Sequence, residues 1–271
     1  MPKLKLTSKP PLGVLLVGHG SRDDSGTAQF METAARVAER LPQMSVEPCF
    51  LELARPTIDE GFARLVLRNI DQILVMPLLL FAAGHAKRDI PAVVSRAAAA
   101  HPQVSIAQTP HLGCHDAIVE LSAVRFEEAL VGRPEIPPED TLLLMVGRGS
   151  QDAEATREMH AFAKLRHARI PVGRFEVSFL AMAEPSLQSA LEAVAGLAYR
   201  RIVVQPHLLF EGLLVTDLCR QVAAAADRQT ENEWLVAEPL GPAELLAGAA
   251  VERIVATAQK VAGRPNHVLP A

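Results

Sequence analysis

Leu-Val-Gly-His-Gly-Ser-Arg-Asp at residues 16–23 and Met-Val-Gly-Arg-Gly-Ser-Gln-Asp at residues 145–152 are two versions of one stretch. In each, an apolar run ends in Gly-X-Gly-Ser-X-Asp, where X is His19 in the first copy and Arg148 in the second, 129 positions later. A short, continuously apolar run is typical of a parallel strand buried on both faces, and the glycine-rich residues after it predict a loop. The chain therefore starts the same α/β unit twice.

The same spacing continues beyond these stretches. Phe50-Leu51 and Pro56 recur as Phe179-Leu180 and Pro185, residues 73–77 recur as 202–206, and Leu79-Leu80-Phe81 recurs as Leu208-Leu209-Phe210. After Phe210 the spacing falls to 128 and pairs Gly84 with Gly212, Leu112-Gly113 with Leu240-Gly241, and Arg125 with Arg253. We therefore predict two tandem domains, residues 1–132 and 141–262, joined by the linker 133–140.

The hydrophobic pattern of the first half alternates between strands and helices. Strands are expected at residues 13–17, 46–53, 73–77 and 104–108, and helices at residues 27–41, from Pro56-Thr57 onward, at 89–101 and at 116–130, with a loop at 81–88. Thr57 followed by Glu60 matches a capping box at a helix start. This alternation predicts an α/β fold in which each domain has a small parallel sheet flanked by helices.

Composition excludes several classes of function. The net charge of −4 and the aromatic content of 4% argue against a nucleic-acid partner. The three cysteines, Cys49, Cys114 and Cys219, are scattered, which argues against a disulfide framework and favours a reducing compartment. The sequence shows no signal-peptide pattern, and its longest apolar run, at residues 73–84, is too short to span a bilayer. We therefore expect a cytoplasmic protein without a membrane segment.

The residues with the most chemical potential follow the predicted strands, where ligands bind in open parallel sheets. His19 lies between two glycines, in a pattern that is neither a dinucleotide fingerprint nor a phosphate-binding loop. His85 follows the small residues Ala82-Ala83-Gly84. Two neutral imidazoles across a cleft suit a borderline divalent ion such as Co²⁺, Fe²⁺ or Ni²⁺, and two ligands leave coordination positions open.

Both histidines are absent from the second copy. Arg148 stands in the place of His19, and Leu213 stands in the place of His85. Joint loss of the two residues indicates a joint role, as in a metal site. Glu52, which Ala181 replaces, is equally compatible with completing the ligand set, with carrying protons and with being a solvated acid.

The remaining candidates are expected to be structural. His111 matches Pro239 in the second copy, and His207 lies in the half that lacks the metal-capable pair. Ser21 is followed by Arg22-Asp23 and not by the glycine of a nucleophile elbow. Its expected work is therefore to hydrogen-bond the turn or a substrate carboxylate.

Four of these stretches together resemble the CbiX/SirB group of class II chelatases, which insert Co²⁺ or Fe²⁺ into sirohydrochlorin. They are Leu-Val-Gly-His19-Gly-Ser-Arg-Asp, Phe-Leu-Glu52-Leu-Ala-X-Pro, Met-Pro-Leu-X-Leu-X-Ala-Ala-Gly-His85-X-X-X-Asp-Ile-Pro and Pro-His-Leu-Gly. The likeness covers nearly the whole chain, including the degenerate second half of the long, two-domain form. It implies two chelatase-like domains that face each other across a cleft, with His19 and His85 as the metal-site residues of a lyase.

The resemblance also implies a mechanism and a partner. Metal insertion strips water from the ion, removes two pyrrole protons and distorts the macrocycle, without a covalent intermediate. His19 and His85 would hold the ion, and Glu52 is a candidate proton relay. Sirohydrochlorin carries many carboxylates, so cations should bind it. The expected substrate-binding residues are Ser21, Arg22, Lys87, Arg88 and Arg148.

Several properties stay open at this level. No tightly bound cofactor is expected, because Co²⁺ or Fe²⁺ is a substrate; cobalt would place the protein in cobalamin biosynthesis and iron in sirohaem biosynthesis. A monomer is expected, since internal duplication can replace a dimer. The alternative is a non-catalytic metal carrier or tetrapyrrole-binding protein of the same fold, which turnover would distinguish. A hydrolase that uses Ser21 is a more distant alternative.

Overall fold

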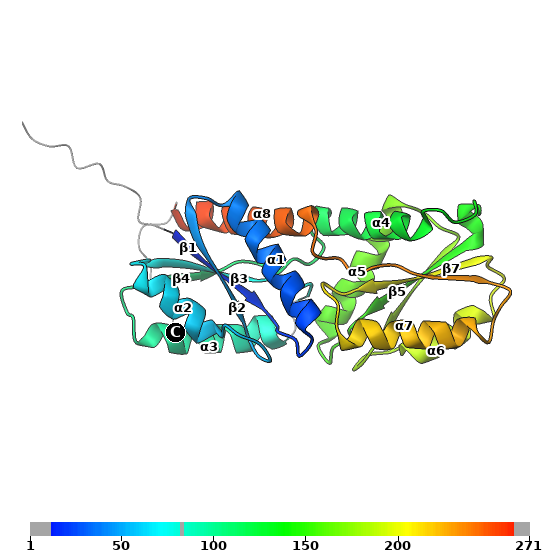
Figure 1. Cartoon of the computed structure of the whole chain (residues 1–271), viewed down its shortest axis with the longest axis horizontal. Coiled ribbons are helices and arrows are strands. Elements are labelled where there is room, and N and C mark those ends of the chain that lie inside the picture. Colours follow the sequence, from blue (N-terminus) through cyan, green and yellow to red (C-terminus); the bar gives the residue numbers. More distant parts are fainter. Residues whose placement is uncertain (1–11, 82–83, 263–271) are drawn as a thin grey trace, which may run out of the picture.

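Each half of the chain forms a four-stranded parallel sheet with helices packed against it (Figure 1). The computed structural model describes residues 12–81 and 84–262, and of His85 and Ala86 it describes the backbone alone. The elements of the first half are β1 (Leu12–Gly18), α1 (Asp24–Arg40), β2 (Met44–Phe50), α2 (Ile58–Leu67), β3 (Gln72–Pro77), η1 (His85–Asp89), α3 (Ile90–Ala99), β4 (Ser105–Gln108) and α4 (Asp116–Leu130). After the short turn η2 (Pro138–Asp140), the second half contains β5 (Thr141–Gly147), α5 (Ala153–Arg169), β6 (Arg174–Phe179), α6 (Leu187–Ala195), β7 (Arg201–His207), α7 (Leu213–Ala226), β8 (Glu233–Val236) and α8 (Glu244–Ala262).

The two sheets have the same strand order. It is β2-β1-β3-β4 in the first lobe and β6-β5-β7-β8 in the second, and all the paired strands are parallel. The apolar runs Val14–Val17 and Leu142–Val146 lie inside β1 and β5 and are fully buried. Strands with neighbours on both sides and helices on both faces need such runs. The predicted α/β fold with a duplicated parallel sheet is therefore confirmed.

Some element bounds differ from those predicted, and the differences affect the site. β2 ends at Phe50, so Glu52 lies in the loop after the strand. Helix α1 begins at Asp24 because the Asp23 carboxylate accepts a hydrogen bond from Ser25 N at 2.9 Å. A π-helical turn, η1, replaces the end of the loop expected at residues 81–88. The capping box at Thr57 is present as predicted.

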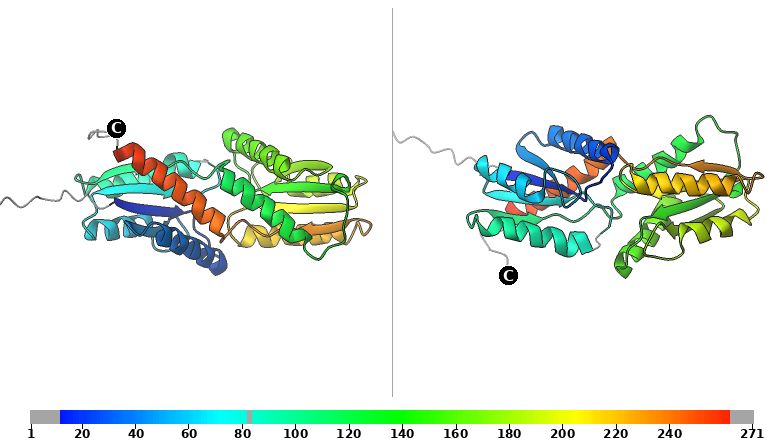
Figure 2. Two further views of the ribbon diagram at one scale, coloured as in Figure 1. Left: turned by 90° about the horizontal axis from the view of Figure 1, so that it is seen from above. Right: turned by 60° about the horizontal axis from the view of Figure 1, so that its bottom comes forward.

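The two lobes exchange their last helices. Helix α4 comes from the first repeat but packs on α5 and β7 of the second lobe, while α8 packs on α1, β3 and β4 of the first. The two exchanged helices also contact each other, and the views in Figures 1 and 2 agree on this arrangement. The predicted domains, residues 1–132 and 141–262, follow the sequence repeat; the lobes in space differ from them by this exchange.

Reciprocal arginines secure the exchanged helices. Arg125 on α4 donates from Nε to Pro239 O at 2.8 Å and from a guanidinium NH₂ group to Leu240 O at 3.2 Å. Arg253 on α8 donates to Leu112 O at 3.0 Å. The paired positions 125 and 253, and 112 and 240, are the repeat identities found at a spacing of 128. Each repeat therefore binds the other's Leu-Gly loop.

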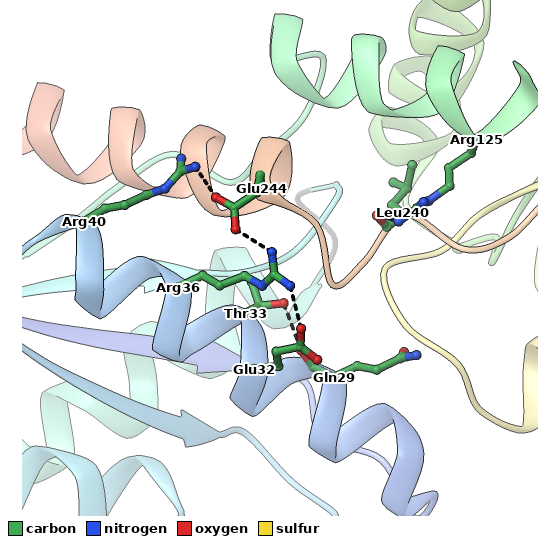
Figure 3. A network of polar contacts seen from close by, with 8 residues as sticks. All are labelled: Gln29, Glu32, Thr33, Arg36, Arg40, Arg125, Leu240 and Glu244. Atoms are coloured by element: carbon green, nitrogen blue, oxygen red, sulfur yellow. Dashed lines mark hydrogen bonds and ion pairs between the residues drawn. The ribbon is translucent and has the colours of Figure 1, made fainter. Parts of the chain in front are cut away.

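Helix α8 is also tied to α1 at its start. The Glu244 carboxylate pairs with Arg36 and Arg40, and Arg36 also pairs with Glu32 at 2.7 Å (Figure 3). The pKa of the Glu244 carboxyl is lowered by its hydrogen bonds to Arg40 and Arg36. These ion pairs are exposed to solvent, so they fix the place where α8 begins more than they add stability.

Both lobes contribute to one hydrophobic cluster. It contains Val14 and Leu16 of the first sheet, Leu143 and Met145 of the second, and Leu246 of α8. Separate clusters fill the opposite face of each sheet. The lobes are thus joined through buried apolar surface as well as through polar contacts. Given their length and hydropathy, none of the helices within residues 12–81 and 84–262 could span a bilayer.

We expect Arg125→Met to lower the free energy of unfolding by about 1–3 kcal/mol, since it removes charge-assisted hydrogen bonds to two carbonyl groups. Urea unfolding followed by circular dichroism measures this. The exposed linker residue Arg133 offers the control, Arg133→Met, which should change stability by less than about 0.5 kcal/mol. Equal stability of the two variants would contradict the role of Arg125.

Candidate active site

Two adjoining cavities lie where the carboxyl ends of the two sheets face each other. The larger has a volume of about 810 Å³ and the smaller of about 340 Å³. His19 and Arg148 line both, so the cavities meet at this pair. Ligands bind at the carboxyl ends of strands in open parallel sheets, and this cleft is the corresponding region here.

The two cavities are related by the internal repeat. In the larger one, Leu79–Phe81 after β3 face Gly147–Ser150 at the end of β5. In the smaller one, Leu208–Phe210 after β7 face Gly18–Ser21 at the end of β1. The larger cavity is also lined by Gly84 and Lys87, the neighbours of His85 in sequence, whereas Leu213 lines the smaller one. The loop that carries His85 therefore belongs to the larger cavity, which His19 also lines.

A close approach between two loops positions His19. Gly20 has φ of +99°, and a Cβ on it would lie 1.7 Å from the carbonyl oxygen of Glu52. Glu52 N donates to His19 O at 3.0 Å, which holds the loop after β1 against the loop after β2. Gly149 meets Ala181 in the same way, with a corresponding distance of 1.7 Å. Gly20 is therefore required for the docking of the two loops, because any residue with a Cβ would clash with the Glu52 carbonyl group.

This docking brings His19 next to Glu52. His19 Nε2 lies 3.4 Å from Glu52 Oε1, and Nδ1 lies 3.3 Å from Gly20 O. The imidazole is 23% exposed and the carboxylate 50% exposed. If Nδ1 carries the proton and donates it to Gly20 O, the lone pair of Nε2 is directed to the same region as the carboxylate oxygen. A nitrogen and an oxygen so placed can share one cation, either a proton or a metal ion.

The side chain of His85 lies outside the described part of the structure. Its backbone begins η1, the π-helical turn that leads into α3. Such turns are frequent at functional sites. Among the described side chains, no three His, Cys, Asp or Glu residues are grouped so as to hold a metal ion. The pairing of His19 with His85 thus stays a prediction.

The four predicted cations lie in different parts of the cleft. Arg88 lines the larger cavity, Arg22 lines the smaller, and Arg148 lines both. Lys87 Nζ instead binds Asp152 Oδ2 at 2.8 Å and Glu154 Oε2 at 2.6 Å, at the start of α5 in the other lobe. These hydrogen bonds raise the pKa of Lys87 and lower the pKa values of Asp152 and Glu154. Lys87 therefore ties η1 to the second lobe.

Ser21 takes the first of its two expected roles. Its Oγ accepts a hydrogen bond from Asp23 N at 3.0 Å, and Asp23 caps α1. Ser150 and Asp152 repeat this arrangement at α5, where the Ser150 Oγ to Asp152 N distance is also 3.0 Å. The Ser-X-Asp pattern common to both copies is thus a helix-start motif. A contact between Ser21 and a substrate carboxylate remains a prediction.

His207 is a cavity residue that sequence reasoning set aside. It ends β7, is 2% exposed and lines the larger cavity. The ring centroids of Phe162 and Phe81 lie 4.0 and 5.1 Å from its own. Burial lowers its pKa to about 3, and neither ring nitrogen has a hydrogen-bond partner among the described residues. The sequence feature that could have indicated a buried position is its counterpart in the first repeat, the apolar Leu78.

His111 connects the lobes. Its Nε2 lies 3.0 Å from Glu158 Oε1 on α5, and both side chains are partly buried. Its structural assignment agrees with this contact, although the partner belongs to the other repeat and so could not be identified from local sequence.

Comparisons with known proteins agree with this geometry. The profile of the family described as CbiX matches residues 13–129 and again residues 142–257. A protein of Priestia megaterium named sirohydrochlorin ferrochelatase is 34% identical over 76% of this chain and 76% of its own length. A second Priestia megaterium protein, named sirohydrochlorin cobaltochelatase, is 31% identical over 76% of this chain and 66% of its own length. The structure of SirB from Bacillus subtilis with Fe³⁺ superposes with a TM-score of 0.82 at 28% identity and covers 94% of this chain and 98% of that one.

We expect Lys87→Met to loosen η1, because it removes the two ion pairs that tie this turn to α5. Hydrogen exchange should become faster at residues 85–90 and stay unchanged in α2, with little change in overall stability, as for other exposed pairs. Lys164→Met, at an exposed lysine of α5, is the control. Unchanged exchange at residues 85–90 in Lys87→Met would show that the tether has no effect.

We expect His207→Leu to stabilise the protein by about 1–3 kcal/mol at neutral pH, since it replaces a buried imidazole that makes no hydrogen bond to the described residues by leucine, the residue found at position 78. The unfolded state binds a proton below about pH 6.5, whereas the folded state does not until about pH 3. The wild type therefore loses stability as the pH falls through this window, and the variant escapes that loss.

Urea unfolding at pH 7.5 and 5.5 measures this effect. The stability difference between His207→Leu and wild type should widen by about 1 kcal/mol at the lower pH. His160→Leu, at an exposed position, is the control for replacing a histidine by leucine. A constant difference for His207→Leu would mean that this imidazole titrates normally in the folded state.

Proposed function

The chain belongs to the CbiX family, and from this premise we propose that it is a chelatase that inserts Co²⁺ or Fe²⁺ into sirohydrochlorin. The observation that carries the proposal is the position of His19 beside Glu52 at the wall of a cavity of about 810 Å³ that both lobes enclose. This volume lies within the usual range for a small-molecule site. The metal ion is a substrate of the reaction.

His19 and His85 bind the ion in this proposal. Nε2 of His19 supplies one nitrogen ligand, and His85 supplies the second from the η1 turn. Gly84 just before this turn and Lys87 within it line the same cavity. Two imidazole ligands leave other coordination positions open for water and for the ring nitrogens of the tetrapyrrole. A site of this kind holds the ion long enough for transfer without trapping it.

Glu52 and His19 accept the displaced protons. Insertion of a divalent ion releases two N–H protons from the macrocycle, so two bases are needed. The carboxylate of Glu52 takes one, and the imidazole of His19 takes the other once its ion has moved into the ring. Glu52 Oε1 lies 3.4 Å from Nε2 of His19, which lines the cavity, so the two bases lie next to each other.

Cations bind the carboxylates of the substrate. Arg88 and Arg148 serve the larger cavity, and Arg22 with Ser21 serves the side chains of sirohydrochlorin that reach the smaller one. Lys87 instead holds η1 to the second lobe, because its ammonium group is already paired with two carboxylates there. The positive charge also steers the anionic substrate toward the cleft.

The proposed reaction needs only one copy of the chain. Loops of both lobes already enclose the cavities, so we place the reaction in a monomer. Cys49, Cys114 and Cys219 are all free, which suits a reducing compartment, and we place the reaction in the cytoplasm.

Replacing either histidine by alanine should reduce insertion of Co²⁺ and Fe²⁺ by about 100-fold or more while the fold is kept. The absorbance change of sirohydrochlorin with catalytic amounts of protein measures the rate, and circular dichroism checks the fold. His160→Ala, at an exposed position outside both cavities, is the control. Full activity of His19→Ala or His85→Ala would refute the assignment, and a stoichiometric shift without turnover in the wild type would identify a carrier or binding protein.

A further inference from the structure

Two loops at the cleft carry an exposed apolar side chain on a left-handed backbone. Leu53 has φ of +63° and follows β2, and Met182 has φ of +57° and follows β6, 129 positions later. Their exposed fractions are 50% and 56%. The two residues occupy equivalent places in the repeat, so each lobe presents one of them.

This backbone conformation is unfavourable for both residues. L-amino acids with a Cβ rarely adopt positive φ, and asparagine is among the few that tolerate it. Among the described residues other than glycine, the third with positive φ is Asn69. Strained positions of this kind persist where the surrounding structure fixes them, and they cluster at functional sites.

The loops themselves explain how the strain is maintained. Phe50 N donates to Pro56 O at 2.8 Å across the first loop, and Phe179 N donates to Pro185 O at 3.0 Å across the second. Each loop is also docked on the Gly-X-Gly turn of its own lobe, through the contacts of Gly20 and Gly149. These backbone contacts do not require a large apolar side chain at the tip of either loop, position 53 or 182. The apolar side chains of Leu53 and Met182 therefore need another explanation.

The positions of the two loop tips explain their apolar side chains. Met182 lines the larger cavity and Leu53 lines the smaller, on the two sides of the His19–Arg148 pair. Of the eight large apolar residues recorded as exposed in the described part of the chain, four line these cavities: Leu53, Met182, Leu213 and Leu214. Exposed apolar surface is thus concentrated where the ligand enters. A ligand that covers it must have apolar surface of its own as well as charge.

We propose that Leu53 and Met182 are positioning residues that clamp the tetrapyrrole ring, one from each lobe. The inference rests on the proposed function, and it assigns the apolar ring surface to these two side chains while the arginines bind the carboxylates. The flexible thioether of Met182 can adapt to a macrocycle that changes shape as the metal enters. The pre-fixed loops present both side chains without further loss of backbone freedom on binding.

Asparagine substitutions test the clamp, because asparagine keeps the left-handed backbone but removes the apolar contact. Leu53→Asn and Met182→Asn should each raise the Kd for metal-free sirohydrochlorin, and the KM for it in Co²⁺ insertion, by about tenfold. The kcat should stay near the wild-type value, since the ring is contacted both before and during insertion. The unfolding midpoint should be unchanged or higher, whereas a merely structural role would lower it.

Leu67→Asn is the matched control, at a leucine that is 81% exposed at the end of α2 and outside both cavities. It should leave Kd, KM and kcat unchanged. Wild-type Kd and KM in both tip variants would overturn the clamp, and so would an effect confined to one of them. In either case an active wild type would leave the proposed function intact, whereas a wild type that neither binds sirohydrochlorin nor inserts metal would refute that function itself.

Discussion

The exchange of α4 and α8 is the constraint on which the rest of the structure depends. Each sheet receives its last helix from the other repeat, and one hydrophobic cluster runs through both lobes. Arg125 and Arg253 then bind the Leu-Gly loop of the opposite repeat. These contacts leave little freedom for the lobes to separate, so the carboxyl ends of the two sheets face each other at a fixed distance. The cavities are a consequence of that distance.

A small difference between the repeats distinguishes the two cavities. The stretch from Phe81 to Gly84 is one residue longer than the stretch from Phe210 to Gly212. The shorter stretch lies close to the first lobe, where Ser25 Oγ donates to Glu211 Oε2 at 3.2 Å and Glu211 N donates to Gln29 Oε1 at 2.8 Å. The smaller cavity is on that side. Gly84, at the end of the longer stretch, lines the larger cavity and precedes η1, and Lys87 of η1 binds the second lobe.

The sequence was sufficient for the repeat, for the parallel sheets and for the helix start at Thr57, because these depend on local patterns of apolar residues and caps. It also identified His19 and Glu52 as candidate site residues. It could not predict the helix exchange, because α4 reads the same whichever sheet it covers. The partners of Lys87 and His111 lie 65 and 47 positions away in the other lobe, and no local pattern reveals such contacts. His207 was set aside for a related reason, since its burial depends on Phe162 and Phe81, from two other elements.

The positions that the two copies share and those that differ have separate physical roles. The shared ones are mechanical: Gly20 and Gly149 leave room for a carbonyl group that a Cβ would clash with, Asp23 and Asp152 cap helices, and Arg125 and Arg253 bind the opposite loop. Three of the positions that differ carry the proposed metal and proton chemistry: His19 with Arg148, His85 with Leu213, and Glu52 with Ala181. Both copies therefore keep the residues that hold the frame together, whereas the first copy alone has the residues of the proposed chemistry. A single metal site between two lobes needs the second lobe to enclose the cavity. The residues with which the second lobe lines the cavity can therefore differ in charge and apolar surface, to suit the substrate, as long as its loops still dock.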